Sequence, residues 1–171
     1  MLCAIPDLRH SQTPLLIVLG DQIPIGELSQ TFFELVASNP STNVIATSKI
    51  CNANDKTIIQ TKRASLGYVP ESTFVHEFAE VRGMMLPGTH LERSGFDFIK
   101  RSDTLFDAIL LMKRIEHTLY GEYRLTTAYQ NMLNRGAEFG TFPIDYVSVG
   151  DKEHIDEAIE YYERRKTSLL H

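Results

Sequence analysis

The chain has 171 residues, of which 43% are hydrophobic and 23% are charged, so its composition predicts a folded globular domain rather than a disordered segment. Its 17 Lys and Arg residues against 22 Asp and Glu residues give a net charge of −5, which argues against a nucleic-acid-binding protein. The sequence shows no signal peptide, no apolar run long enough to span a membrane and no C-x-x-C spacing of its two cysteines. We therefore expect one cytoplasmic domain over residues 1–171, with a loose N-terminus over about residues 1–12.

The first half of the chain predicts mainly strands. Apolar or β-branched runs bounded by turn residues indicate strands at residues 15–21, 43–50, 56–61 and 66–69. One helix is predicted at residues 25–39, where apolar side chains recur at helical spacing before Asn39-Pro40. VLGDQ at residues 18–22 could carry Asp21 into a cleft at the end of a strand, but no glycine-rich nucleotide-binding motif follows it.

The second half of the chain predicts helices. They are expected at about residues 73–85, 103–120, 122–135 and 152–166. In the last of these, acidic residues come first and basic residues last, which suits the helix dipole. Strands followed by helices predict the α+β class, with a small sheet in the N-terminal half and a helical C-terminal half packed on one face of it.

The predicted helix at residues 74–85 carries the candidate chemistry. On a helical wheel, Phe74, Phe78, Val81 and Met85 form an apolar stripe. His76 and Glu80 lie together on the roughly opposite side, one turn apart, so both could reach one metal ion. Glu77 flanks them and could take a proton from a metal-bound water.

The stretch HEFAE at residues 76–80 resembles the H-E-x-x-H helix of the zincin metallopeptidases, especially the gluzincins. Glu80 stands where that family has its second histidine. The resemblance implies His76 and Glu80 as metal ligands, Glu77 as the catalytic base and a glutamate from a later helix as the third ligand. It also implies zinc, with manganese as an alternative because a carboxylate ligand favours harder metals.

The third ligand has several candidates. Glu116 falls within the apolar stripe of the predicted helix 103–120, and a buried carboxylate is costly unless it is paired or bound to metal. A salt bridge from Glu116 to Arg82 or Arg124 is an equally open interpretation. His90 is a further candidate for the ligand set, and the other donors considered are Glu92, His117 and Glu122.

Two hypotheses about function follow. In the first, the chain is a metal-dependent hydrolase acting on peptides or proteins, with Arg82 and Tyr123 stabilising the oxyanion. In the second, His76 and Glu80 are an ordinary exposed pair on a helix, and the chain is a non-catalytic domain that binds a partner protein. Neither hypothesis involves nucleic acid or a membrane, and the oligomeric state stays open.

Overall fold

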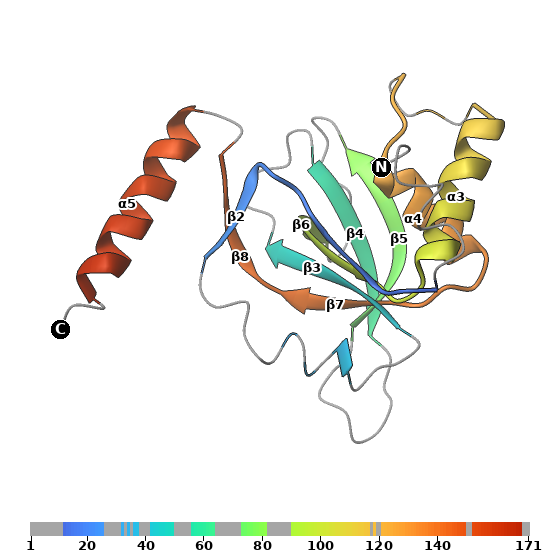
Figure 1. Cartoon of the computed structure of the whole chain (residues 1–171), viewed down its shortest axis with the longest axis horizontal. Helices are drawn as coiled ribbons and strands as arrows, with labels where there is room; N and C mark the ends of the chain where they lie inside the picture. Colours follow the sequence, from blue (N-terminus) through green and yellow to red (C-terminus); the bar gives the residue numbers. More distant parts are fainter. Residues whose placement is uncertain are drawn as a thin grey trace.

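The computed structural model describes residues 12–25, 32, 34, 36–37, 42–49, 56–63, 73–81, 90–116, 118, 121–149 and 152–168. The strands in chain order are β1 (Leu15–Val18), β2 (Gln22–Ile25), β3 (Asn43–Lys49), β4 (Lys56–Arg63), β5 (Thr73–Val81), β6 (His90–Ile99), β7 (Phe139–Pro143) and β8 (Asp145–Ser148). The helices are α3 (Ser102–Arg114), α4 (Leu125–Asn134) and α5 (Lys152–Ser168) (Figure 1). No helix in this part of the chain is long and apolar enough to cross a membrane.

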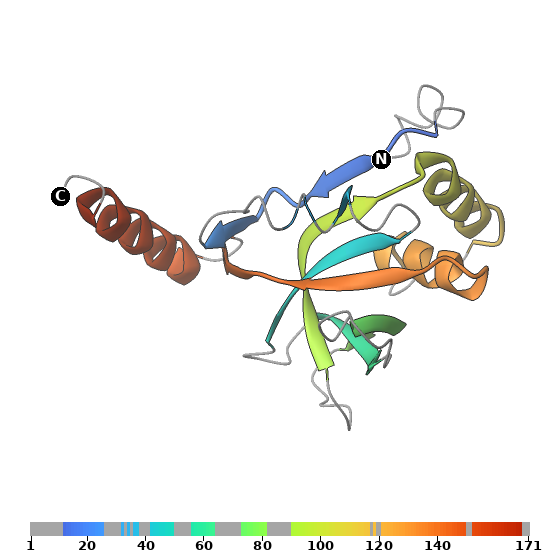
Figure 2. The ribbon, with the colours of Figure 1, turned by 90° about the horizontal axis from the view of Figure 1, so that it is seen from below.

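Six of the strands form one mixed sheet in the order β1-β6-β3-β7-β5-β4. The β3–β7 pair is parallel and the other pairs in this sheet are antiparallel. β4 also pairs with the first residues of β6, so the sheet curls back on itself. β2 and β8 form a separate two-stranded sheet, from which α5 extends away from the body of the domain (Figure 2).

Helices α3 and α4 lie together at one side of the large sheet (Figure 2). They bury one apolar core against it, whose sheet residues are Ile45, Val75, Phe78, Ile99 and Phe139. The rings of Phe78, Tyr129 and Phe139 contact one another, with centroids 5.1–5.7 Å apart. This aromatic group fastens α4 to the centre of the sheet, because offset and edge-to-face ring pairs add to the stability gained by burial.

The α+β class is confirmed, and α3, α4 and α5 correspond to three of the four helices predicted for the second half. α3 ends earlier than predicted, at Arg114. Residues 32, 34, 36 and 37 are helical, within the predicted helix 25–39. The sheet is not confined to the first half, since β6, β7 and β8 come from the second. The predicted strand 66–69 lies outside the described residues.

The helix predicted at residues 73–85 is wrong where the structure describes it, because residues 73–81 form β5. Its register with β4 pairs Glu77 with Gln60 and Val75 with Thr61, so His76 is the extra residue of a β-bulge. A bulge shifts the side-chain alternation by one residue, and Val75 and Phe78 are consequently both buried. The resulting three-residue spacing of apolar residues is what imitates a helix in the sequence.

A buried ion pair lies between β6 and α4. The Arg93 guanidinium donates to the Asp97 carboxylate, with Nε 2.9 Å from Oδ2, and a terminal nitrogen of Arg93 bonds the same oxygen. The Tyr129 hydroxyl donates to Asp97 at 2.8 Å, and its ring stacks 5.3 Å from the Arg93 guanidinium carbon. Burial by itself lowers the pKa of Arg93. The charge of Asp97 and its hydrogen bond raise this pKa by a larger amount, so the guanidinium stays charged.

Tyr129 gives the stability of the fold a predicted pH dependence. Burial, reinforced by the charge of Asp97, raises the pKa of Tyr129 well above its ordinary value. The native state therefore keeps the Tyr129 proton at a pH where the unfolded chain has lost it. The contribution of Tyr129 to the free energy of unfolding consequently declines as pH rises above about 10. Tyr129→Phe should cost about 1–3 kcal/mol at pH 8, because Asp97 loses a hydrogen bond. In urea unfolding, the difference in the free energy of unfolding between wild type and Tyr129→Phe should become smaller between pH 9 and about pH 11. A difference that stays constant over this range would contradict the assignment.

Candidate functional site

The structure does not bring the predicted metal ligands of β5 together. His76 and Glu77 are both exposed on this strand. Residues four apart along a strand are separated by roughly 13 Å, whereas on a helix they are one turn apart. His76 and Glu80 therefore lack the one-turn spacing on which the metal site depended. The side chains of Glu80 and His90, and all of Arg82, lie outside what the structure describes.

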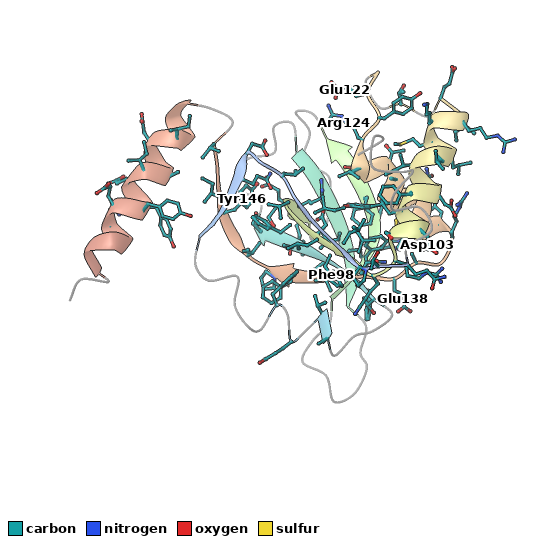
Figure 3. All side chains as sticks on the ribbon, viewed as in Figure 1. Phe98, Asp103, Glu122, Arg124, Glu138 and Tyr146 are labelled. Atoms are coloured by element: carbon teal, nitrogen blue, oxygen red, sulfur yellow. The ribbon has the colours of Figure 1, made fainter. Side chains whose placement is uncertain are left out.

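The predicted partners near α3 and α4 are exposed. Glu116 follows the end of α3 in a turn with φ 49° and is not part of a buried stripe. Tyr123 is 45% exposed. Arg124, considered as a partner of Glu116, bonds Glu122 at 2.9 Å instead (Figure 3). His117 lies outside the described residues.

Among the side chains that the structure describes, no three His, Cys, Asp or Glu residues lie close enough together to hold a metal ion. Glu92, another donor considered, is buried on β6 and accepts a hydrogen bond from the Tyr146 hydroxyl of β8. This contact ties the small sheet to the large one. The described part of the chain therefore offers no ligand set for zinc.

A different group of residues meets where the two sheets join, and we call residues 19–22 together with Ser94 and Gly95 the junction. The backbone N–H of Leu19, directly after β1, donates to the carbonyl of Gly95 at 2.9 Å. The N–H of Val149, directly after β8, donates to the carbonyl of Asp21 at 2.7 Å. These two bonds fix the turn that carries Asp21, whose side chain is exposed. A carboxylate thus projects from a turn that two backbone hydrogen bonds hold at the end of β1.

Gly95 allows Leu19 and Gln22 to lie close to the backbone of β6. Its φ of +72° lies in the left-handed region, which glycine adopts without steric cost. A β-carbon at this position would lie 2.1 Å from Oε1 of Gln22 and 2.9 Å from the β-carbon of Leu19. The side chain of Gln22 therefore occupies the space that a larger residue at position 95 would take.

Two polar atoms of the junction are buried and have no hydrogen-bond partner among the described residues: Oγ of Ser94 and Oε1 of Gln22. Buried polar atoms are nearly always paired, so each of these two atoms has spare capacity for a ligand or a water molecule. The hydroxyl of Ser94 can donate or accept, and Oε1 of Gln22 can only accept. The exposed carboxylate of Asp21, in the same turn as Gln22, can bind a cation.

No family model matches the sequence, and no curated protein matches it. Solved structures do match the fold. One is a UDP-glucose pyrophosphorylase complexed with UDP-glucose, with a TM-score of 0.68 and 14% identity over 91% of this chain and 58% of that chain. A putative glucose-1-phosphate thymidylyltransferase from Bacillus anthracis has a TM-score of 0.65 and 14% identity, over 86% of this chain and 54% of its own.

A UTP-bound UGPase from Acinetobacter baumannii is similar as well, with a TM-score of 0.66 and 14% identity over 99% of this chain and 59% of that chain. The three neighbours are therefore longer proteins, of which this chain spans between 54% and 59%. At 14% identity the likeness establishes that this chain shares its fold with part of each of these three structures.

These neighbours overturn the metallopeptidase hypothesis. The resemblance of residues 76–80 to a zincin helix is wrong, since these residues form a strand and the fold is shared with nucleotidyltransferases. The hydrolase function inferred from that resemblance is wrong with it. The comparisons give no specific support to the alternative of a non-catalytic interaction domain.

Proposed function

We propose that this chain is a sugar-nucleotide-binding domain that takes part in nucleotidyl transfer. In that reaction, a phosphate oxygen of a sugar 1-phosphate attacks the α-phosphorus of a nucleoside triphosphate, and pyrophosphate leaves. The observation that carries the proposal is the fold match over 86–99% of the chain to structures described as sugar-nucleotide enzymes. The junction supports it, because it has an exposed carboxylate at Asp21 and two buried polar atoms without a hydrogen-bond partner among the described residues, Oε1 of Gln22 and Oγ of Ser94.

The residues of the junction suit the polar part of such a ligand. The hydroxyl of Ser94 can donate to a phosphate or sugar oxygen, and Oε1 of Gln22 can accept from a sugar hydroxyl. Hydrogen bonds of this kind would satisfy both buried atoms, which removes the cost of leaving them unpaired. In this proposal, Ser94 and Gln22 orient the sugar phosphate while the turn at Asp21 stays fixed by its backbone bonds.

A divalent cation fits Asp21 if phosphate oxygens complete its coordination. Magnesium in phosphoryl-transfer sites is bound through one or two carboxylates together with waters and substrate phosphates. Asp21 is exposed and its turn is held by backbone hydrogen bonds, so it can serve as such a carboxylate. A bound cation would neutralise charge on the phosphates, and Asp21 would hold it beside the sugar phosphate.

Binding measurements test this function. Titration calorimetry with UDP-glucose and magnesium should show saturable binding, and Asp21→Asn should weaken it at least tenfold because the cation loses its carboxylate. Without magnesium, wild type and Asp21→Asn should bind UDP-glucose with the same affinity. Asp107→Asn is a matched control, since Asp107 is an exposed aspartate on α3, away from the junction. Failure of wild type to bind UDP-glucose, dTDP-glucose and glucose 1-phosphate would refute the proposal, and so would equal binding by Asp21→Asn with magnesium.

A further inference from the structure

The small β2–β8 sheet is tethered to the large sheet at both of its ends. β1 continues into β2 through residues 19–21, and β7 continues into β8 through Ile144. Backbone hydrogen bonds anchor both links on the large sheet, from the Leu19 N–H to the Gly95 carbonyl at 2.9 Å and from the Ile144 N–H to the Thr47 carbonyl at 2.8 Å. Because β2 and β8 are antiparallel, the two links join the small sheet at opposite ends. A sheet held in this way can rotate about its length while both anchors stay in place.

One face of the small sheet contacts β6. Tyr146 lies opposite Pro24 in the β2–β8 pairing, so Gln22, two residues before Pro24, is on the same face as Tyr146. The Tyr146 hydroxyl donates a hydrogen bond to the carboxyl group of Glu92 on β6, and we call this hydrogen bond the latch. The side chains of the small sheet that the structure describes are only partly buried: Gln22, Ile23 and Tyr146. Such contacts open more easily than a packed apolar core.

The side chain of Gln22 lies directly against the backbone of β6. A β-carbon at Gly95 would lie 2.1 Å from Oε1 of Gln22, so no ligand atom fits between this oxygen and β6. The oxygen is buried and has no hydrogen-bond partner among the described residues. A sugar hydroxyl can therefore reach it only when this face of the small sheet moves away from β6. The role proposed for Gln22 thus requires an open state, which the latch opposes.

We propose that the small sheet is a strap that rotates about its length to admit a sugar phosphate at the junction, and that the latch between Tyr146 and Glu92 holds it closed without ligand. This inference rests on the proposed function, which supplies the ligand. Only open molecules bind, so the observed affinity is reduced by the fraction of molecules that are open. The latch is broken both in the open state and in the complex. Its loss therefore raises the open fraction and speeds association, while dissociation stays the same.

Surface plasmon resonance with the whole chain immobilised tests the strap, using UDP-glucose, dTDP-glucose and glucose 1-phosphate in magnesium buffer. Tyr146→Phe keeps the aromatic ring and removes only the hydroxyl that forms the latch. This variant should raise the association rate constant by about threefold to tenfold and leave the dissociation rate constant unchanged. Tyr123→Phe is the matched control, because Tyr123 is 45% exposed and precedes α4. It should change neither rate constant.

Glu92→Gln tests the other half of the latch. Its amide oxygen still accepts a hydrogen bond from Tyr146, so the association rate constant should rise by a smaller factor than in Tyr146→Phe. Far-ultraviolet circular dichroism verifies that each variant keeps its secondary structure. Equal association rate constants in wild type and Tyr146→Phe would overturn the strap and leave the proposed function standing. Faster dissociation from Tyr146→Phe would also overturn the strap, because Tyr146 would then contact the ligand itself. A wild type that binds none of the three ligands would overturn both proposals.

Discussion

Asp97→Asn is expected to lower the free energy of unfolding by about 3–5 kcal/mol. The substitution keeps the size of the side chain but removes the negative charge opposite Arg93, whose guanidinium is buried beside it. Burial alone disfavours the charged form of Arg93, and Asp97 is what outweighs that effect. An arginine stays protonated at neutral pH even without its partner, so the variant contains an uncompensated charge in the core.

The measurement is urea unfolding of wild type and Asp97→Asn at pH 7. An exposed ion pair of the same chain, Arg101 with Asp103, provides the control. Arg101 and Asp103 form the same type of ion pair, with Nε 3.1 Å from Oδ1, but Arg101 lies at the surface. Water solvates either group when the other is removed, so Asp103→Asn should leave the midpoint of unfolding almost unchanged. Equal losses of stability in the two variants would show that burial of the pair is not the cause.

Gly95→Ala is expected to be the second most damaging substitution, with a loss of about 2–4 kcal/mol in the free energy of unfolding. Two effects add at this position. The left-handed backbone at φ +72° is unfavourable for alanine, and its methyl group would overlap Oε1 of Gln22. Relief of the overlap requires Gln22 to move, so the same variant should also weaken binding of UDP-glucose if the proposed function is correct.

Gly136→Ala separates the two effects. Gly136 has φ +89°, but no atom lies within 4 Å of the place where its β-carbon would be built. This variant should therefore show the backbone cost alone, about 1–2 kcal/mol. The difference between the two variants in thermal or urea unfolding measures the crowding at the junction. Identical losses would mean that Gln22 moves aside freely and that the junction is not closely packed.

The parts of the fold that could be predicted are those whose pattern is local. The β-branched runs of β3 and β4 and the amphipathic patterns of α3 and α4 are visible in the sequence because each element carries its own periodicity. β6 shows no such periodicity, because the charged residues Arg93 and Asp97 lie inside this buried strand. Their mutual ion pair makes the burial of both charges possible. β5 could not be predicted, because the bulge at His76 interrupts the alternation by which strands are recognised.

The candidate site could be predicted only in part. Asp21 follows an apolar strand and a glycine, and this pattern indicates a carboxylate at the end of a strand. Ser94 and Gly95 come more than 70 residues later and reach the turn through the pairing of β1 with β6. No local pattern marks them, because their proximity to Asp21 is a product of sheet topology rather than of spacing along the chain.

The central position of β3 has a consequence for biosynthesis. Its two neighbours in the sheet, β6 and β7, are both translated after it, and β7 begins only at Phe139. Contacts between segments so far apart along the chain form slowly, because a long loop must close before the first of them is made. On the ribosome, Val44 and Ile45 of the emerging strand therefore stay exposed to solvent until residues 139–143 have left the exit tunnel. We expect nascent chains that end before residue 139 to bind chaperones rather than to form this sheet.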